Sequence, residues 1–326
     1  MDPCKLCGNS DFVLYPIPRL DLSLIACSFC ALVSLNTMGK RVDYVSSMEK
    51  EFFSEDFINS HDWFQQWLAR RRATRQLREI IKYKVNGELL EIGPGGGELL
   101  SAAIKLGFRC CAMDMSETVA KHVTAMTGAQ VRLGSFQDIE SWGRKFDVIV
   151  MSHVLEHCDD PAASLRALHS ALYRDAIAYI AVPNLASWPA AFSGWKCYLP
   201  YHLYYFTPKT LRNLFESHGF ELLTISTFQD APSWAVTLAR SMVKHAPTVK
   251  RVPLSGGGGF SRNYPKAFLN LWNCLTAFFG YTLTPLHCMQ NLFSRGDELI
   301  VVARAKGIRL LWAFLAFAES IASGVL

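Results

Sequence analysis

The stretch that most constrains the fold of this chain is LLEIGPGGGELL, at residues 89–100. An apolar run leads to Glu91, glycines follow at positions 93, 95 and 97, and a helix-compatible apolar run comes next. Glycine tolerates positive φ and lets a ligand approach the backbone, and a helix N-terminus offers free N–H groups to an anion. The pattern therefore predicts a strand, a tight turn and a helix that together bind a nucleotide-like ligand carrying a carboxylate or phosphate.

Two alternatives qualify this interpretation of the turn. The dinucleotide fingerprint G-x-G-x-x-G does not fit, because Glu98 occupies the position of its third glycine. A glycine turn that only joins a strand to a helix remains the second alternative.

Strand-like and helix-like segments alternate after this turn, which predicts an α/β fold: a doubly wound, Rossmann-like sheet with helices on both faces. The six further strands are expected at 109–113, 130–133, 146–151, 176–182, 220–228 and 298–303, and the helices at 99–106, 116–127, 162–172 and 207–219. Residues 229–296 interrupt the alternation, and we interpret them as an insertion between strands six and seven of a seven-stranded sheet.

Two Cys-x2-Cys pairs near the N-terminus predict a small zinc ribbon. Cys4 and Cys7 form the first pair and Cys27 and Cys30 form the second, with nineteen residues between the pairs. Each pair directs two thiolates at one point, and Zn²⁺ prefers four such ligands in a tetrahedron. A closed site of this kind is structural; a redox-active Cys-x2-Cys is the alternative.

Composition and charge restrict the binding partners and the cellular compartment that we expect. The net charge of +5 is too small to require a nucleic-acid partner. The first thirty residues lack the pattern of a signal peptide, so the ten cysteines suggest a reducing cytoplasm rather than a disulfide-rich secreted protein. The six cysteines outside the ribbon have no metal spacing and are expected to be small buried side chains.

An arginine-rich segment precedes the glycine turn. Aromatic and aliphatic residues recur at helical spacing from Trp63 to Ile81, with arginines at positions 70, 71, 72, 75 and 78. The simpler interpretation is an amphipathic helix that covers the sheet with a solvated basic face. The alternative is a surface for an anionic substrate, acidic lipid or nucleic acid.

Longer motifs resemble one family in particular. The segment FDVIVMSHVLEHCDDP at residues 146–161, HLYYFT at 202–207 and GDELIVVAR at 296–304 occur in the same order as in that family. Together with the glycine turn and the cysteine ribbon, they resemble class I S-adenosylmethionine (SAM)-dependent methyltransferases of the UbiG/Methyltransf_23 type with an N-terminal zinc ribbon. The resemblance covers the chain from Cys4 to Arg304. The family has an antiparallel last strand, the hairpin partner of strand six, and the resemblance implies the same arrangement here.

The resemblance implies a set of cofactor contacts. Glu91, Gly93, Gly95 and Gly97 would form the loop under the methionine part of SAM, and Asp114 would hold the ribose. Met115 would line the adenine pocket. Ser135 takes the usual place of an acidic residue near the adenine, with Phe136 as a stacking replacement, and Ser152 would lie beside the sulfonium.

An alcohol or carbon nucleophile also requires a base. The candidates are His153, Glu156 and His157 of the HVLEH motif and His202 from the later loop. The sequence does not separate three roles for the HVLEH residues: base, divalent-cation site, or structural cap of the following helix.

We expect the acceptor to be a small molecule or lipid-linked metabolite rather than nucleic acid, with O-methylation as the reaction. C-methylation of a sugar intermediate and a non-catalytic binding module on the same fold are the alternatives. The predicted organisation is a ribbon at 1–40, a helical cover at 41–84, a methyltransferase domain at 85–306 and an apolar tail at 307–326. Apolar segments at 262–283 and 307–326 suggest either internal packing or peripheral membrane contact of a cytoplasmic enzyme. The same apolar surfaces could also pack against a second subunit in an oligomer.

Overall fold

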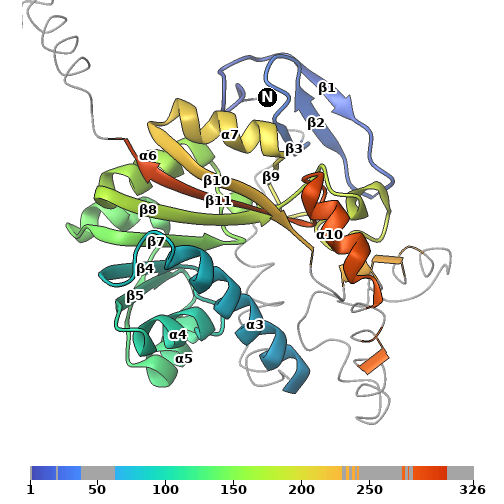
Figure 1. Ribbon diagram of the computed structural model, residues 1–326. Coiled ribbons are helices and arrows are strands. Elements are labelled where there is room, and N and C mark those ends of the chain that lie inside the picture. The colour runs from blue at the N-terminus through green and yellow to red at the C-terminus, as the bar shows by residue number, and fades with distance from the viewer. Residues whose placement is uncertain are drawn as a thin grey trace, which may run out of the picture.

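The computed structural model describes residues 2–19, 21–37, 63–229 and 282–306, with a few residues between 233 and 278 (Figure 1). The start of the predicted helical cover, most of the insertion and the apolar tail lie outside the described residues. Within the described ranges, no helix is both long enough and apolar enough to cross a membrane.

The predicted seven-stranded sheet is confirmed. Its order is β10-β11-β8-β7-β4-β5-β6, and only β11 runs antiparallel to its neighbours. The strands are β4 (Glu88–Ile92), β5 (Arg109–Asp114), β6 (Gln130–Leu133), β7 (Phe146–Ser152), β8 (Leu172–Pro183), β10 (Phe220–Phe228) and β11 (Glu298–Ala305). The parallel strands are nearly continuous apolar runs because both faces of the sheet are covered.

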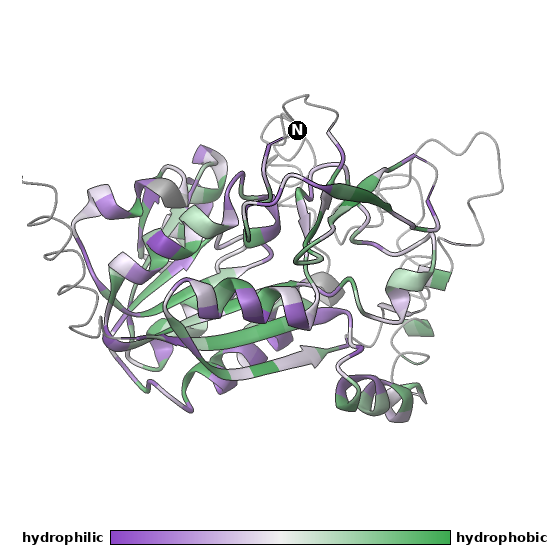
Figure 2. Cartoon of the chain, turned by 90° about the horizontal axis from the view of Figure 1, so that it is seen from above, coloured by the Kyte–Doolittle hydropathy of each residue, from purple (hydrophilic) through white to green (hydrophobic). Residues whose placement is uncertain are grey.

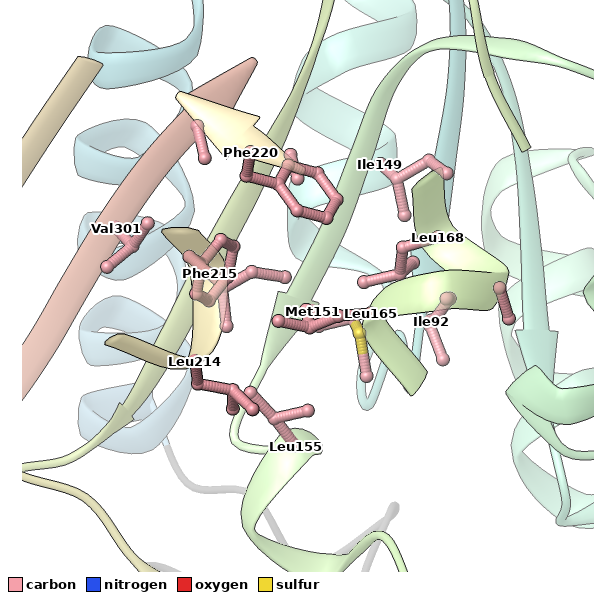
Figure 3. Close-up of a cluster of buried hydrophobic side chains, with 14 of the residues drawn as sticks. Ile92, Ile149, Met151, Leu155, Leu165, Leu168, Leu214, Phe215, Phe220 and Val301 are labelled. Atoms are coloured by element: carbon pink, nitrogen blue, oxygen red, sulfur yellow. The ribbon is translucent and has the colours of Figure 1, made fainter. Parts of the chain in front are cut away.

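Helices pack on both faces of this sheet (Figure 1). On one face lie α3 (Trp63–Ile80), α4 (Glu98–Lys105) and α5 (Glu117–Thr127), whose buried side chains meet β-strand residues such as Val148 and Tyr179. On the other face α6 (Pro161–Ala171) and α7 (Pro208–Ser217) pack against residues such as Met151 and Val301 (Figure 3). In Figure 2 the central strands are green and the flanking helices carry both green and purple, as amphipathic cover should.

Helix starts follow the capping chemistry of the sequence. Asp160 accepts a hydrogen bond from the Ala163 N–H at the start of α6, and Thr207 accepts one from the Thr210 N–H at the start of α7. Both helices have proline at their first position, where no N–H is needed. The elements that we did not predict include the short 3₁₀ helices η1 (Phe136–Trp142), η2 (Leu155–His157) and η3 (Pro189–Ala191) and the helix α10 (Thr284–Leu292).

The N-terminal ribbon is joined to the larger sheet through one short strand. Its strands β1 (Phe12–Tyr15), β2 (Leu24–Cys27) and β3 (Val33–Leu35) form an antiparallel sheet, which β9 (Tyr204–Tyr205) completes. A separate core of Leu24, Trp195, Tyr198, Tyr205 and neighbouring residues fills the space between ribbon and loop. The ribbon thus supports the loop that contains the HLYYFT motif.

Candidate functional site

The glycine turn has the backbone geometry that its composition predicts. Gly93, Gly95 and Gly97 all have positive φ, at 68°, 53° and 81°. A Cβ on Gly93 would lie 2.7 Å from Cγ2 of Val154, so the turn also passes close to the HVLEH segment. The α4 helix begins directly after the turn, at Glu98, and directs its free N–H groups to the carboxyl edge of the sheet.

Two buried carboxylates lie at this edge, on neighbouring parallel strands. Burial raises the pKa of Glu91 on β4 well above its usual range, and Oε2 of Glu91 has no hydrogen-bond partner among the described residues. Burial also raises the pKa of Asp114 at the end of β5, to about 6, although Oδ1 accepts a 2.8 Å hydrogen bond from the Ser116 N–H. An unpaired acceptor beside a glycine cradle fits a ligand that brings both a cation and hydroxyl groups.

The predicted adenine-side residues follow the ends of β5 and β6. Met115 is 46% exposed, and the Gly134 N–H donates to the Asp114 carbonyl over 3.0 Å, which places the Ser135 loop beside Asp114. Ser135 is the N-cap of η1, and its N–H donates to Oδ2 of Asp138 over 2.9 Å. The acidic residue of this loop therefore caps η1. The side chain of Phe136 lies outside the described part of the chain.

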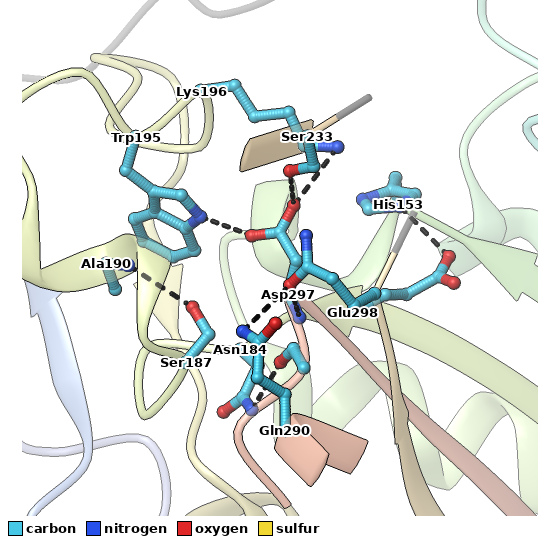
Figure 4. Close-up of polar contacts among 12 residues, drawn as sticks. His153, Asn184, Ser187, Ala190, Trp195, Lys196, Ser233, Gln290, Asp297 and Glu298 are labelled. Carbon is cyan, nitrogen blue, oxygen red and sulfur yellow. Dashed lines mark hydrogen bonds and ion pairs between the residues drawn. The ribbon is translucent and has the colours of Figure 1, made fainter. Parts of the chain in front are cut away.

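His153 follows β7 directly and lies between the carboxylates of Glu156 and Glu298, of which Figure 4 shows Glu298. Its Nδ1 is 3.3 Å from Oε1 of Glu156, and its Nε2 is 3.3 Å from Oε1 of Glu298. Burial lowers the pKa of His153, but the contacts with Glu156 and Glu298 outweigh burial and raise that pKa to about 9. The residue has φ of 57°, in the left-handed region, which turns the chain sharply out of the strand.

Glu156 also borders a second group of polar side chains. Glu156, His157 and His202 place their ligand atoms within 4.8 Å of one another, and the two imidazole rings meet edge to face at 4.7 Å. Nδ1 of His157 lies 3.0 Å from the Tyr201 carbonyl, to which it donates, so Nε2 is left as an acceptor. Burial lowers the pKa of His202 to about 3, which leaves a neutral imidazole. Two imidazoles and a carboxylate could hold a divalent cation.

The structure therefore brings all four predicted base candidates together around Glu156. Nδ1 of His153 contacts this carboxylate, and ligand atoms of His157 and His202 lie within 4.8 Å of it. The aromatics of the HLYYFT loop serve partly as core: Tyr205 is 1% exposed, and its hydroxyl donates to the Leu199 carbonyl.

Two site residues, Gln76 and Glu298, were missed by sequence reasoning. Nε2 of Gln76, on α3, donates a 2.9 Å hydrogen bond to Oγ of Ser152 and so connects this helix to the end of β7. Glu298 is the first residue of β11, opposite Pro183 of β8. One signal could have located Glu298: an antiparallel strand begins at the edge where its parallel neighbours end, so the first residue of the last strand belongs to the site.

A cavity of about 830 Å³ adjoins His153. It lies between α3, the Lys196–Cys197 segment, α10 and the start of β11. Its wall contains Glu298, which forms an ion pair with Arg75 of α3, and Asp297, which accepts from Trp195 and Ser233 (Figure 4). A volume of this size accommodates a small-molecule ligand.

The fold and the glycine-turn site define a class I SAM-dependent methyltransferase. A family model described as "Methyltransferase domain" (Methyltransf_23) matches residues 62–225, and the chain belongs to this family.

Individual curated relatives match only part of this chain, and the solved structures share few identical residues with it. The ubiquinone biosynthesis O-methyltransferase of Pseudomonas aeruginosa (strain UCBPP-PA14) is 30% identical over 119 residues, which are 32% of this chain and 51% of that protein. Its namesake from Caulobacter vibrioides is 35% identical over 103 residues, 29% of this chain and 40% of the relative. The chain thus spans about half the length, or less, of these curated relatives. Among solved structures, a SAM-dependent methyltransferase from Archaeoglobus fulgidus covers 81% of this chain and 100% of its own, with 17% identity and a TM-score of 0.47.

Proposed function

We propose that the protein transfers a methyl group to a hydroxyl oxygen of a small-molecule or lipid-linked acceptor, with His153 as the general base. The observation that carries this proposal is the double pairing of His153 with Glu156 and Glu298, next to Ser152 and the glycine turn. The relatives named as O-methyltransferases support oxygen as the acceptor atom.

SAM, when bound, supplies an electrophilic methyl group on a positively charged sulfur. We propose that the glycine turn cradles its methionine part and that the unpaired oxygen of Glu91 accepts from its ammonium group. Asp114 would accept from the ribose hydroxyls, because its side chain lies at the end of β5, one strand further along the same edge. Met115, Ser135 and Phe136 remain the proposed adenine contacts. These residues contribute mainly alignment, which can lower a transfer barrier by roughly 7–11 kcal/mol.

His153 must lose a proton before it can accept one. With both carboxylates in place its pKa is about 9, so the imidazolium predominates at neutral pH. Glu298 has a second partner, Arg75, so an acceptor hydroxyl can replace Glu298 at Nε2 without isolating this carboxylate. Removal of one neighbouring negative charge lowers the pKa of His153 toward the operating pH, where a base works best. Glu156 would stay on Nδ1 and orient the ring.

The ribbon is proposed to bind one structural Zn²⁺. Sγ of Cys4 lies 3.4 Å from Sγ of Cys30, and Sγ of Cys7 lies 3.5 Å from Sγ of Cys27. These separations approach the edge of about 3.8 Å expected for a tetrahedron with Zn–S bonds of about 2.3 Å. The four thiols therefore suit the ion without rearrangement of the ribbon.

The reaction can be tested with SAM that carries a ¹³C-labelled methyl group. The protein is incubated with metabolite fractions of a cell extract, and the product is examined by NMR. An oxygen-bound methyl resonance is expected in a small-molecule or lipid fraction. A carbon-bound methyl would refute O-methylation, and label found only in RNA or protein would refute the acceptor class.

A further inference from the structure

The cavity beside His153 has an excess of positive charge. Six of its lining side chains are arginine or lysine, besides His153, and two are carboxylates. The cations are Arg70, Arg71, Arg72, Arg75 and Arg78 of α3, with Lys196 opposite, and the carboxylates are Asp297 and Glu298.

Both carboxylates are already occupied by protein partners. Asp297 accepts hydrogen bonds from Trp195 and Ser233 and forms an ion pair with Lys196 at 3.2 Å (Figure 4). Glu298 is shared between Arg75 and His153. Both carboxylates therefore have closer partners than the remaining arginines, of which only Arg72 also acts on Glu298 electrostatically.

Three of these arginines form no ion pair within the part of the chain that the structure describes, although Arg72 interacts with Glu298 over a longer distance. Arg70, Arg72 and Arg78 form no ion pair with any described carboxylate. Positive charge gathered in a cleft with low-dielectric walls concentrates anions there. The cavity is thus built to receive a ligand with more than one negative charge.

The aromatic lining holds two of the guanidinium groups in place. The Arg71 guanidinium lies 4.6 Å from the centre of the Trp67 ring, and that of Arg75 lies 3.7 Å from the centre of the Phe228 ring. A stacked, planar guanidinium suits two-point recognition of phosphate oxygens. Several such groups in one cavity favour phosphate over a single carboxylate.

The cavity is continuous with the proposed site of methyl transfer. His153 and Glu298 belong to its wall, and Gln76, next to Arg75 on α3, donates to Ser152. We propose, resting on the function given above, that this cavity binds a phosphate or diphosphate group of the methyl acceptor. The acceptor is then a phosphorylated compound whose hydroxyl reaches His153 while its anionic group is held by α3.

The probe for the first experiment is inorganic pyrophosphate, titrated calorimetrically into the full chain. The test variant is the pair Arg72→Gln and Arg78→Gln, and the matched control is Arg166→Gln, an exposed arginine on α6. We expect at least a tenfold loss of pyrophosphate affinity in the double variant only, with unchanged affinity for S-adenosylhomocysteine in both proteins. No binding of pyrophosphate to the wild type at millimolar concentration, or equal affinity in all three proteins, overturns the proposal.

The second experiment identifies the source of the phosphate. Extract fractions are treated with phosphatase and nucleotide pyrophosphatase before methylation with labelled SAM. Loss of the label after treatment supports the proposal. The labelled product of the untreated fraction then identifies the source: an aqueous product indicates a nucleotide- or sugar-phosphate, and an organic-phase product indicates a lipid phosphate. Label that survives the treatment overturns the proposal. Protein that binds S-adenosylhomocysteine but not pyrophosphate refutes this cavity proposal alone, whereas folded protein that binds no S-adenosylhomocysteine refutes the enzymatic function.

Discussion

His153 and Glu298 lie 3.3 Å apart, from Nε2 to Oε1, although their strands β7 and β11 are separated by β8. The left-handed backbone at His153 turns the chain toward β8, where its N–H donates to the Ala181 carbonyl over 2.8 Å. Glu298 sits opposite Pro183 of the same strand. One strand thus brings together a histidine and a carboxylate that are far apart in sequence.

Replacement of Glu298 by Gln should change the pH dependence of methyl transfer. The carboxylate raises the pKa of His153, so the variant's histidine becomes neutral at a lower pH. If His153 is the base, the acidic limb of the rate profile moves to lower pH. The profile of kcat/KM measures this, with Glu216→Gln on the surface of α7 as control. An acidic limb that does not move would show that His153 is not the base.

The same histidine predicts how stability depends on pH. Its folded pKa of about 9 exceeds the unfolded value of about 6.5, so its stabilising contribution is complete below pH 6.5 and is lost as the pH rises through 9. The free energy of unfolding should therefore fall between pH 7 and 9 in the wild type, and less so in Glu298→Gln. Urea unfolding at several pH values measures both slopes; parallel slopes would contradict the pairing.

Asp114→Asn should weaken binding of S-adenosylhomocysteine. Loss of a charged acceptor costs about 1.5–3 kcal/mol, roughly a tenfold to hundredfold loss of affinity. Because burial raises the pKa of Asp114 to about 6, wild-type affinity should also decline as the pH falls below 6. Calorimetry gives both values. Asp175→Asn, an exposed change at the opposite edge of the sheet, should bind normally; equal losses in both variants would rule out a specific role.

Gly93→Ala and Gly107→Ala form a matched pair for the cofactor turn. Both glycines have positive φ, 68° and 94°, so alanine at either should cost about 1–2 kcal/mol of stability. Only at position 93 would the new Cβ meet another residue, Val154, at 2.7 Å. We expect Gly93→Ala to lose S-adenosylhomocysteine binding and Gly107→Ala to retain it. Retained binding in both would show that the turn does not hold the cofactor.

Zinc removal should affect the acceptor side as well as the ribbon. Metal analysis is expected to give about one zinc per chain, and Cys27→Ser should lose the metal and lower the melting temperature. Cys274→Ser, at an exposed cysteine outside both the ribbon and the cavity lining, is the control. Because β3 pairs with β9, the Cys27 variant should also raise KM for the acceptor. Metal-free, folded wild-type protein would refute the zinc site.

Membrane contact through residues 262–283 and 307–326 can be tested by flotation of the protein with anionic liposomes. If these segments contact the membrane, the full chain floats and a chain lacking 307–326 does not, because Trp and Phe side chains insert at the headgroup boundary; if they pack internally, neither floats. Full-length protein that stays at the bottom of the gradient would exclude this attachment.

The sheet could be predicted because its strands are buried on both faces and read as apolar runs. Gln130–Leu133 and Phe220–Phe228 match the expected ranges, and the antiparallel last strand is confirmed. The start of β8 was misplaced: Leu172, the C-cap of α6, already pairs with Phe146, and exposed residues extend the strand before the apolar run begins. Such an extension depends on a partner strand and leaves no local pattern.

The candidate site was only partly accessible from sequence. Motif residues such as His153 and Asp114 can be recognised in the sequence because they stand at the ends of apolar strands. Gln76 does not, since it lies on a helix among arginines, and only packing directs it to Ser152. The three-residue group around Glu156 likewise depends on a backbone link, the Leu203 N–H to the Glu156 carbonyl over 2.8 Å.

The β10–β11 hairpin has an evolutionary consequence. Phe228 ends one strand and pairs with Glu298 at the start of the other, so everything between them leaves and re-enters the sheet at the catalytic edge. Chain can therefore be added, removed or exchanged at this point without a change in strand pairing, next to the cavity that we propose for the acceptor. The hairpin thus separates the sheet, which carries the proposed cofactor residues, from the segment inserted between β10 and β11. We expect this segment to vary among related proteins with different acceptors while the residues of the sheet stay the same.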